Sequence, residues 1–351
     1  MMSFMRKVFL AVVLILILSL ATLTWQAFQF WYSSPSQESE RVVFEVPPGA
    51  SFRRVAEDLE HKGLVGSAKK LTIMARLTGF TTKTRMGEYA LDRTMRPIEI
   101  LEIISSGKSI GYSFTVPEGT NMYEVARLLA DQGLGDADEF LRLCQSKPLI
   151  RELLREDLPN LEGYLFPETY QMTKFTEEET LVRTMVQNFL KVYEELPHRE
   201  TSLTRHQVVT LASVVEKETG APEERPLIAS VFHNRLKKSM RLQSDPTILY
   251  GILAETGEMK KNITKKDILT YNKYNTYRVN ALPFGPISNP GRAALEATLR
   301  PATSEFLYFV SRNEGTHVFT KTYEDHQRMV RKFQLDPSMR EGKSWRDRTA
   351  Q

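Results

Sequence analysis

Cysteine is nearly absent from this chain, which carries only Cys144 among its 351 residues. One cysteine excludes a disulfide framework within the chain and a metal site built from several thiolates. The six histidines are scattered without HExxH-like spacing, so the sequence predicts no metal centre and no cofactor. A lone cysteine also suits an oxidising compartment, in which unpaired thiols are a liability.

A large net charge is also lacking. The formal net charge is +4, with basic and acidic residues mixed throughout, so the sequence predicts no nucleic-acid partner. Hydrophobic residues make up 41% of the chain and charged residues 26%, a balance that is ordinary for globular proteins. The length therefore predicts two or three folded domains.

One long apolar run lies near the N-terminus, from Val8 to Trp25. It is long enough to cross a hydrocarbon layer of ~30 Å at ~1.5 Å per residue. Arg6 and Lys7 precede it and predict a cytoplasmic N-terminus, because cations remain on the inner side. Aromatic residues that suit the far interface follow it: Phe28, Phe30, Trp31 and Tyr32.

We therefore expect a cytoplasmic stub at 1–7, an uncleaved single-pass anchor at 8–32 and a polar linker at 33–40, with the remainder outside the cytoplasm. A cleaved signal peptide is the alternative, since Ser19-Leu20-Ala21 is a weak cleavage-like triplet.

A sequence pattern then occurs twice. VPPGASFRRVAEDLEHKGL (Val46 to Leu64) and VPEGTNMYEVARLLADQGL (Val116 to Leu134) share V-P-x-G, V-A-x-x-L and a final G-L. Each copy predicts a strand, a turn and a short helix that ends before Gly63 or Gly133. The apolar stripes of the two helices would be Phe52, Val55, Ala56 and Leu59, and Met122, Val125, Ala126 and Leu129.

The first copy and its surroundings resemble a LysM-like module, a β-α-α-β fold whose family binds N-acetylglucosamine-containing glycans. The resemblance implies a LysM-like region at 41–135. A spacer or packing module that contacts no sugar is the alternative.

The next segment, NLEGYLFPETY (Asn160 to Tyr170), lies between predicted helices at 137–154 and 178–196. Its aromatic residues include Tyr164, and its carboxylates are Glu162 and Glu168. Aromatic rings stack on sugar faces and carboxylates accept from sugar hydroxyls, so the segment is a candidate sugar contact. Ordinary core aromatics are the alternative interpretation.

A helix after Thr204, with Gln207 in the capping-box position, carries the most informative residues. Its apolar residues cover one broad face, and Glu216 and Glu218 project near opposite edges of that face. A partly desolvated carboxyl has a raised pKa and can act as a general acid near neutral pH. Two helix-end charges held by Lys or Arg are the alternative.

The remaining segments give further local predictions. Asp245 before Pro246 predicts a helix start with Asp as N-cap, and Asn289-Pro290 predicts the start of a helix at 292–299. FLYFV and HVFT predict a hairpin, followed by a helix from about Tyr323 and a charged, frayed tail.

Seven motifs in fixed order carry a broader resemblance: EGYLFPETY, ASVVEKET, VFHNRL, MRLQSDPTILYG, YNTY, LPFGPISNPG and LYFV. They resemble those of the YceG-like endolytic murein transglycosylases. The resemblance implies a catalytic domain at 136–338 and a charged tail at 339–351. The predicted fold class is α+β: a single N-terminal transmembrane helix, a LysM-like β-α-α-β subdomain and a mixed α/β catalytic domain.

The resemblance also implies a reaction. The family cleaves the β-1,4 bond between N-acetylmuramic acid and N-acetylglucosamine in nascent peptidoglycan strands, leaving 1,6-anhydromuramoyl ends and limiting strand length. The second glutamate of its E-K-E motif is catalytic and falls on Glu218, with Glu216 in a supporting position. Motif positions that would line the cleft are Gln243, Ser244, Asp245, Tyr274, Asn275, Thr276 and Tyr277, with Glu162, Tyr164 and Glu168 as supporting residues.

The implied location is the inner membrane, with the catalytic domain in the periplasm. The implied partners are peptidoglycan glycan strands and peptidoglycan synthases. Two alternatives remain open: a non-catalytic glycan-binding scaffold, and a hydrolytic muramidase that uses Glu162, Glu168 or Asp245 as its second carboxylate.

Overall fold

The computed structural model describes residues 2–197, 202–218 and 221–336, which form two compact units. The first unit runs to Ser113 and also includes Gln171–Thr176, and the second holds the other described residues. The second copy of the repeat therefore belongs to the second unit, while the first copy belongs to the first. The predicted tail at 339–351 lies outside the described residues.

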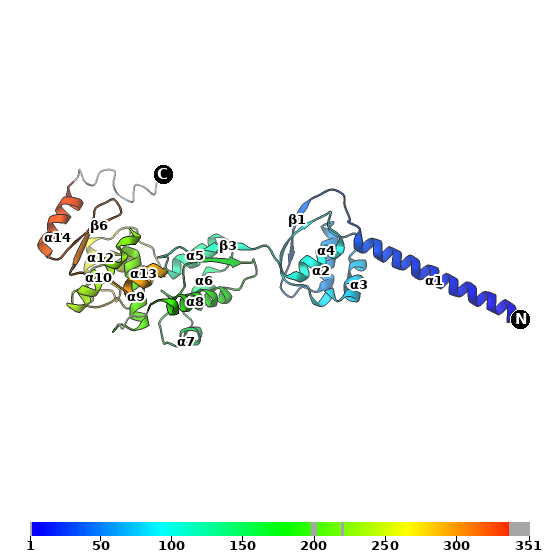
Figure 1. Cartoon of the computed structure of the whole chain (residues 1–351), viewed down its shortest axis with the longest axis horizontal. Helices are drawn as coiled ribbons and strands as arrows, with labels where there is room; N and C mark the ends of the chain where they lie inside the picture. Colours follow the sequence, from blue (N-terminus) through cyan, green and yellow to red (C-terminus); the bar gives the residue numbers. More distant parts are fainter. Residues whose placement is uncertain (1, 198–201, 219–220, 337–351) are drawn as a thin grey trace. The chain divides into compact units, whose positions relative to one another are not determined.

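The first unit combines helices with a two-stranded antiparallel sheet (Figure 1). Its elements are α1 (Met2–Tyr32), β1 (Arg41–Val46), α2 (Phe52–His61), α3 (Ala68–Thr78), β2 (Gly87–Asp92) and α4 (Pro97–Ser106). β1 pairs with β2 so that Arg41 lies opposite Asp92 and Val46 opposite Gly87. Phe44, Leu59 and Tyr89 are fully buried between the sheet and the helices.

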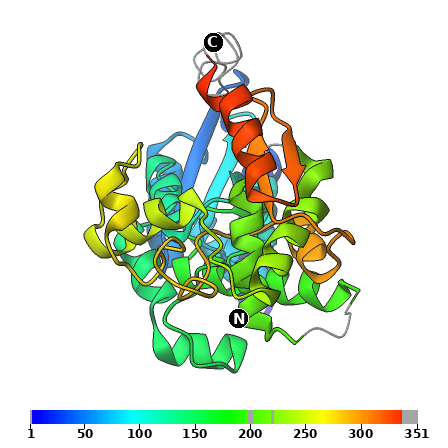
Figure 2. The same cartoon turned by 90° about the vertical axis from the view of Figure 1, so that its left-hand side faces the viewer.

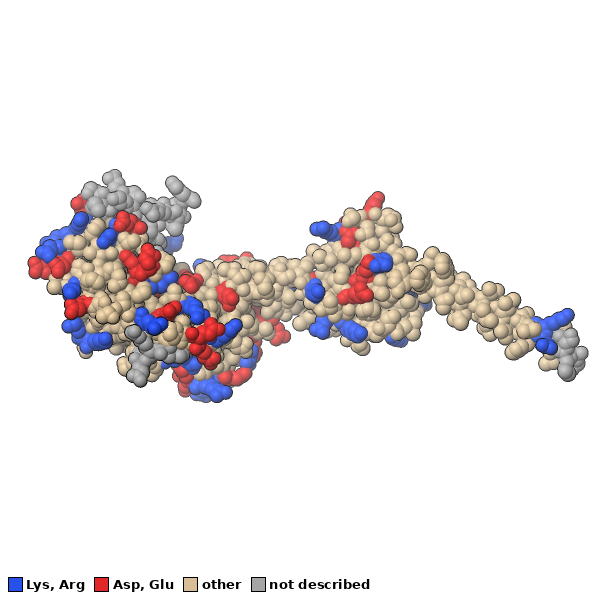
Figure 3. Space-filling view, viewed as in Figure 1, with Lys and Arg blue, Asp and Glu red and all other residues tan. Residues whose placement is uncertain are grey.

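Helix α1 is long and apolar enough to cross a membrane over Phe4–Tyr32. Figure 3 shows its surface free of charged side chains beyond the cations near its start. A cleaved signal sequence passes the same test of length and composition. Two aromatic residues depart from the predicted interfacial belt. Trp31 is only 4% exposed and its ring lies 6.4 Å from that of Phe80, and the partly buried Phe30 packs against the same core.

The second unit is mainly helical. Its helices are α5 (Met122–Asp131), α6 (Ala137–Cys144), α7 (Lys147–Leu154), α8 (Glu178–Glu195), α9 (Arg205–Glu218), α10 (Arg225–Lys237), α11 (Asp245–Thr256), α12 (Lys265–Leu269), α13 (Arg292–Leu299) and α14 (Tyr323–Val330). Its hairpin is β5 (Tyr308–Ser311) with β6 (His317–Thr320), which confirms the predicted hairpin with a later start. β3 (Tyr112–Thr115) pairs with β4 (Thr169–Met172), and the division between the units falls within both strands.

The repeat forms the same local structure twice. Gly63 and Gly133 have positive φ after the ends of α2 and α5, as their positions in the pattern predict. The amide of Leu64 bonds to the carbonyl of Leu59, and Leu134 to Leu129, which ends both helices in a Schellman arrangement. All the predicted stripe residues are buried except Phe52, which is half-buried.

Helix α9 lies in the interior of the second unit. Figure 2 shows green helices in the middle of the view, with the yellow segment at its left edge. Thr204 and Gln207 form the predicted capping box. Every residue from Val208 to Glu216 is buried, so the helix is enclosed on all sides rather than on one face. Its polar Ser213 fits there because its hydroxyl donates to a carbonyl of the helix and accepts from the amide of Ile287.

Two predictions of local structure were wrong. The predicted helix at 137–154 is broken into α6 and α7, because Ser146 begins a new helix with Pro148 in its first turn. The N-cap of α11 is Ser244 and not Asp245. Helix α13 has the predicted bounds, Arg292–Leu299, and Gly291 is its N-cap.

Asn289 instead joins distant segments. Its side-chain oxygen accepts from the amides of Gly163 and Leu165 at 2.9 and 3.0 Å, and its side-chain nitrogen donates to the carbonyl of Thr120 at 2.8 Å. The residue is fully buried. An unpaired buried polar group costs about 1–3 kcal/mol, so these three bonds hold the segments beside α9 together.

We therefore expect Asn289→Ala to lower the free energy of unfolding of the second unit by about 2–5 kcal/mol, because it leaves the buried amides of Gly163 and Leu165 without an acceptor. Urea unfolding checks this. Asn262→Ala, at an exposed position, is the control and should change stability by less than about 0.5 kcal/mol. Equal stability of the two variants would contradict the bridging role.

Candidate active site

Glu218 is the last residue of α9 and is half-buried. Burial is the main cause that raises the pKa of its carboxyl to about 7. The negative charge of Asp245 raises this pKa further, while the Ser244 hydroxyl and the Arg235 guanidinium lower it. The C-terminal end of a helix also disfavours a negative charge. A carboxyl with this pKa can both donate and accept a proton near neutral pH.

The side chains around Glu218 come from the segment before α11 and from the YNTY motif. The Ser244 hydroxyl donates to Oε1 of Glu218 at 2.6 Å. The Ser244 amide in turn donates to the Thr276 hydroxyl at 2.9 Å. This bond fixes the backbone of Ser244 and so the position of the hydroxyl that binds Glu218. The exposed Asp245 accepts from the Tyr277 hydroxyl at 2.7 Å. Burial and the neighbouring carboxylates raise the pKa of Tyr277, which keeps this phenol a donor.

Arg235 completes the polar surroundings and was missed in the sequence. It is 7% exposed, donates through Nε to the Leu307 carbonyl at 2.7 Å and through Nη1 to the Leu242 carbonyl at 2.5 Å. Its guanidinium lies 5.4 Å from the centre of the Tyr308 ring. A signal existed, because Arg235 follows Val231 by four residues and so lies on the buried side of α10.

Glu216 lies in different surroundings two residues earlier. One carboxylate oxygen pairs with Arg225 at 2.8 Å, and the other accepts from the amide of Gly291 at the start of α13 at 2.9 Å. The side chains of Glu216 and Arg225 are 5% and 13% exposed. Glu216 thus joins α9 to the starts of α10 and α13, and its supporting role in the site stays a prediction.

The other predicted supporting residues lie elsewhere in the second unit. Glu162 is 1% exposed and accepts from the amide of Met122 at the start of α5, and burial raises its pKa to about 8. Tyr164 is fully buried and bonded to His206, so its ring offers no face to a sugar in this structure. Glu168 is exposed and accepts from the Asn188 side chain.

The predicted cleft residues fall into two groups. Ser244, Asp245, Thr276 and Tyr277 surround Glu218 through the contacts above. Gln243 adjoins them, exposed and with φ of 50°, while its amide donates to the Thr276 carbonyl at 3.3 Å. Tyr274 packs in the core against Tyr250, and Asn275 is buried with its side-chain nitrogen directed at three carbonyls. Tyr274 and Asn275 therefore stabilise the YNTY motif from the side of the core.

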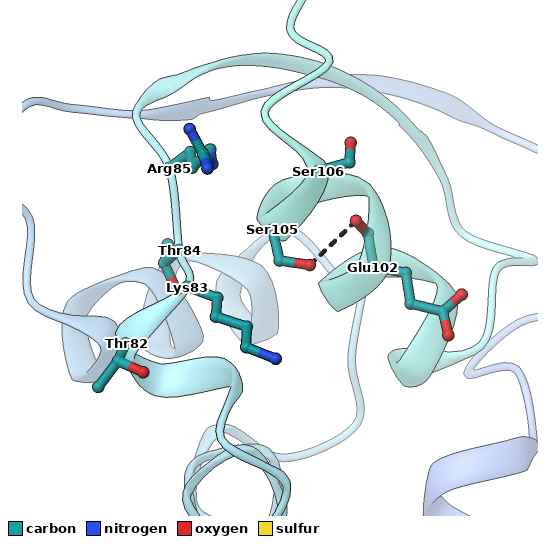
Figure 4. Close-up of a pocket in the computed structure, with 7 residues that line it drawn as sticks. All are labelled: Thr82, Lys83, Thr84, Arg85, Glu102, Ser105 and Ser106. Carbon is teal, nitrogen blue, oxygen red and sulfur yellow. Dashed lines mark hydrogen bonds between the residues drawn. The ribbon is translucent and has the colours of Figure 1, made fainter.

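A hollow of about 590 Å³ lies in the first unit and is a separate feature. Figure 4 shows Lys83, Arg85 and Glu102 around it, with the Ser105 hydroxyl bonded to the Glu102 carbonyl. The hollow is lined by a single carboxylate, Glu102, whose side chain is exposed. The hollow therefore contains no desolvated acid. Among the described residues, no group of three or more His, Cys, Asp or Glu side chains could hold a metal ion.

Comparison with known families identifies the chain. A family model described as the YceG-like family matches residues 44–332. The chain belongs to the YceG-like family. The family model therefore spans parts of both units and includes Glu216, Glu218 and the segments around them.

Two curated relatives are similar to this YceG-like chain. The endolytic murein transglycosylase of Bacillus subtilis (strain 168) is 32% identical over 311 residues, which cover 83% of this chain and 84% of the relative. That of Streptococcus pneumoniae serotype 2 (strain D39 / NCTC 7466) is 30% identical over 325 residues, or 82% of this chain and 58% of the relative. The chain thus spans little more than half of the streptococcal protein.

A solved structure agrees with the family assignment. A crystal structure of a protein from Listeria monocytogenes, described as yceG-like, is 31% identical with a TM-score of 0.55. The match covers 83% of this chain and 100% of that one. The mixed helix-and-sheet fold described above is therefore shared with another YceG-like protein.

The two glutamates of this YceG-like chain should affect stability in opposite directions. The pKa of Glu218 is about 7 when folded and about 4.3 when unfolded, so the folded state binds the extra proton between these values. The stability from this proton is fully present below pH 4.3 and is lost as the pH rises through 7. We expect Glu218→Gln to be more stable than the parent at pH 8, by about 1–3 kcal/mol, and equal to it at pH 4.

The matched variant Glu216→Gln should instead lose about 3–5 kcal/mol at pH 8, because it leaves the buried Arg225 without its carboxylate. Urea unfolding of both variants at the two pH values measures the difference. Loss of stability in Glu218→Gln at pH 8 would contradict the conclusion that burial disfavours the ionised form of Glu218.

Proposed function

We propose that this protein is an endolytic murein transglycosylase in which Glu218 is the single catalytic carboxyl. It cleaves the β-1,4 bond between N-acetylmuramic acid and N-acetylglucosamine in nascent glycan strands and so limits their length. The observation that carries the proposal is the raised pKa of Glu218 within the ring of Ser244, Asp245 and Tyr277. The curated names of the relatives agree with it.

One carboxyl suffices for this reaction. Protonated Glu218 gives its proton to the glycosidic oxygen as the bond to C1 of the muramoyl unit breaks. The resulting carboxylate then takes the proton of the muramoyl C6 hydroxyl while that oxygen bonds to C1. The products are a free 4-hydroxyl on N-acetylglucosamine and a 1,6-anhydromuramoyl end. Glu218 is returned to its protonated form, and no water is consumed.

The groups that neighbour Glu218 have different electrostatic roles in this reaction. Positive charge develops at C1 in the transition state, and Asp245 is the exposed carboxylate beside Glu218 that can stabilise it. Tyr277 donates to Asp245 and orients it. Ser244 holds Oε1 of Glu218, which leaves the other carboxyl oxygen for proton transfer. Gln243 adjoins this group and is a candidate contact for the sugar.

We place the reaction in the periplasm, at the inner membrane. Helix α1 would be a single-pass anchor with its N-terminus in the cytoplasm, since Arg6 and Lys7 precede its apolar stretch. The order β1–α2–α3–β2 in the first unit supports a LysM-like, glycan-binding subdomain. Peptidoglycan synthases, which supply nascent strands, are the expected protein partners.

A hydrolytic muramidase is the second candidate, because Asp245 lies near enough to Glu218 to raise its pKa. In that case Asp245 would be the second carboxylate that hydrolysis requires. Glu162 is less suited, because its carboxylate is buried at the start of α5.

The proposal predicts internal cleavage that depends on Glu218. The full-length protein in detergent, incubated with long nascent glycan strands, should shorten them rapidly at internal positions. Glu218→Gln should lower the rate by at least about a thousandfold, because the amide cannot donate the required proton. Strand length measured by chromatography checks this.

Glu194→Gln is the control, because its carboxylate is exposed on α8, away from the predicted site residues. It should cleave at the rate of the parent. Full activity of Glu218→Gln would instead favour a glycan-binding scaffold in which the glutamates are structural.

A further inference from the structure

One surface of the second unit carries exposed apolar and basic side chains that the proposed reaction does not use. Leu269, Tyr271 and Phe284 are 57%, 70% and 50% exposed. Figure 2 places the yellow segment that contains α12 at the periphery of this unit. We call this the α12 surface and define it by six residues: Lys265, Lys266, Leu269, Tyr271, Lys273 and Phe284.

The charge of this segment is one-sided, unlike the mixed charge expected for the whole chain. Residues 258–278 hold six Lys or Arg and two acidic residues, a net charge of +4. Lys260 pairs with Asp267 at 2.5 Å. Within the described part of the chain, no ion pair engages Lys265, Lys266 or Lys273. The α12 surface therefore presents cations that are available to an acidic ligand.

The aromatic residue Phe284 is held in place. Its ring meets that of Tyr274 edge-on at 6.0 Å between centres, and its amide bonds to the carbonyl of Lys273 at 3.1 Å. The ammonium group of Lys273 lies 4.0 Å from the centre of the Phe284 ring. An ordered ring with an adjacent cation suits a ligand with both a flat apolar face and a negative charge.

The α12 surface is rigidly connected to the candidate active site. The side-chain nitrogen of Asn275 donates to the carbonyls of Asp267, Ile268 and Thr270, at 3.2, 3.2 and 2.8 Å. Asn275 thereby fixes the end of α12 to the YNTY motif. The next residue of this motif, Thr276, accepts a hydrogen bond from the Ser244 amide. The α12 surface is therefore held in a fixed position relative to the segment that contacts Glu218.

We propose that the α12 surface is a second binding site for the glycan strand, which holds sugars beyond the cleaved bond together with their acidic peptide stems. Tyr271 and Phe284 would stack on sugar faces, and the three lysines would pair with free carboxylates of the stems. This inference rests on the proposed function, because it takes peptidoglycan as the substrate. The connection of this surface to the Glu218 segment through Asn275 favours the strand over an anionic membrane as the occupant.

Binding and cleavage can be tested separately. The probes are long glycan strands that carry stem peptides and the same strands after an amidase has removed the stems. Binding is measured with the full-length Glu218→Gln protein in detergent at low salt, so that no strand is cut. Two sets of substitutions are introduced separately into this protein: Lys265→Gln/Lys266→Gln/Lys273→Gln and Tyr271→Ala/Phe284→Ala.

We expect the triple lysine variant to bind stem-bearing strands about tenfold more weakly and stem-free strands as the parent does. The aromatic pair should weaken binding of both probes by about fivefold or more. The controls are Lys191→Gln/Lys237→Gln/Lys238→Gln, which removes three exposed charges elsewhere, and Tyr323→Ala, at a position that is 58% exposed. Both controls should bind as the parent does.

Binding by the α12 variants that equals that of the controls would overturn the inference. The inference would also fail if the variants kept glycan binding but lost binding to anionic lipid vesicles, which would identify a membrane contact. Cleavage by the protein with Glu218 intact is measured in parallel. Absence of cleavage would count against the proposed function, while the binding results would still decide the α12 surface.

Discussion

The ionised form of a carboxyl group at the C-terminal end of a buried helix is disfavoured by low solvation and by the helix dipole. The candidate active site depends on this constraint. Helix α9 is enclosed on all sides as far as Glu216, so its last residue, Glu218, lies at the margin of the core. Burial there raises the pKa of Glu218 to about 7. Asp245 adds to the effect, and Ser244 and Arg235 limit it.

The rest of the second unit keeps that helix end in position. Glu216, two residues before Glu218, has both carboxylate oxygens engaged, by Arg225 and by the start of α13. Asn289 joins the turn after β3 to the EGYLFPETY segment beside α9. Two glutamates on one helix thus have different electrostatic surroundings: Glu216 is paired with Arg225 and a backbone amide, while burial raises the pKa of Glu218.

Much of the fold was predictable where the determining contacts are local. The capping box at Thr204, the glycines after α2 and α5 and the hairpin follow from spacing within a few residues. The bridging role of Asn289 and the burial of Tyr164 and Asn275 could not be predicted, because they depend on packing between segments far apart in the sequence. Sequence spacing located the two glutamates, but only their three-dimensional neighbours separate their electrostatic surroundings.

The central claim is that one protonated carboxyl cleaves the strand and that the substrate supplies its own nucleophile. Cleavage in water enriched in ¹⁸O, followed by mass spectrometry of the new ends, tests it directly. We expect 1,6-anhydromuramoyl ends without ¹⁸O, because the C6 oxygen attacks C1. Reducing muramic acid ends that carry one ¹⁸O would contradict it, and would point to attack by water with Asp245 as the second carboxylate.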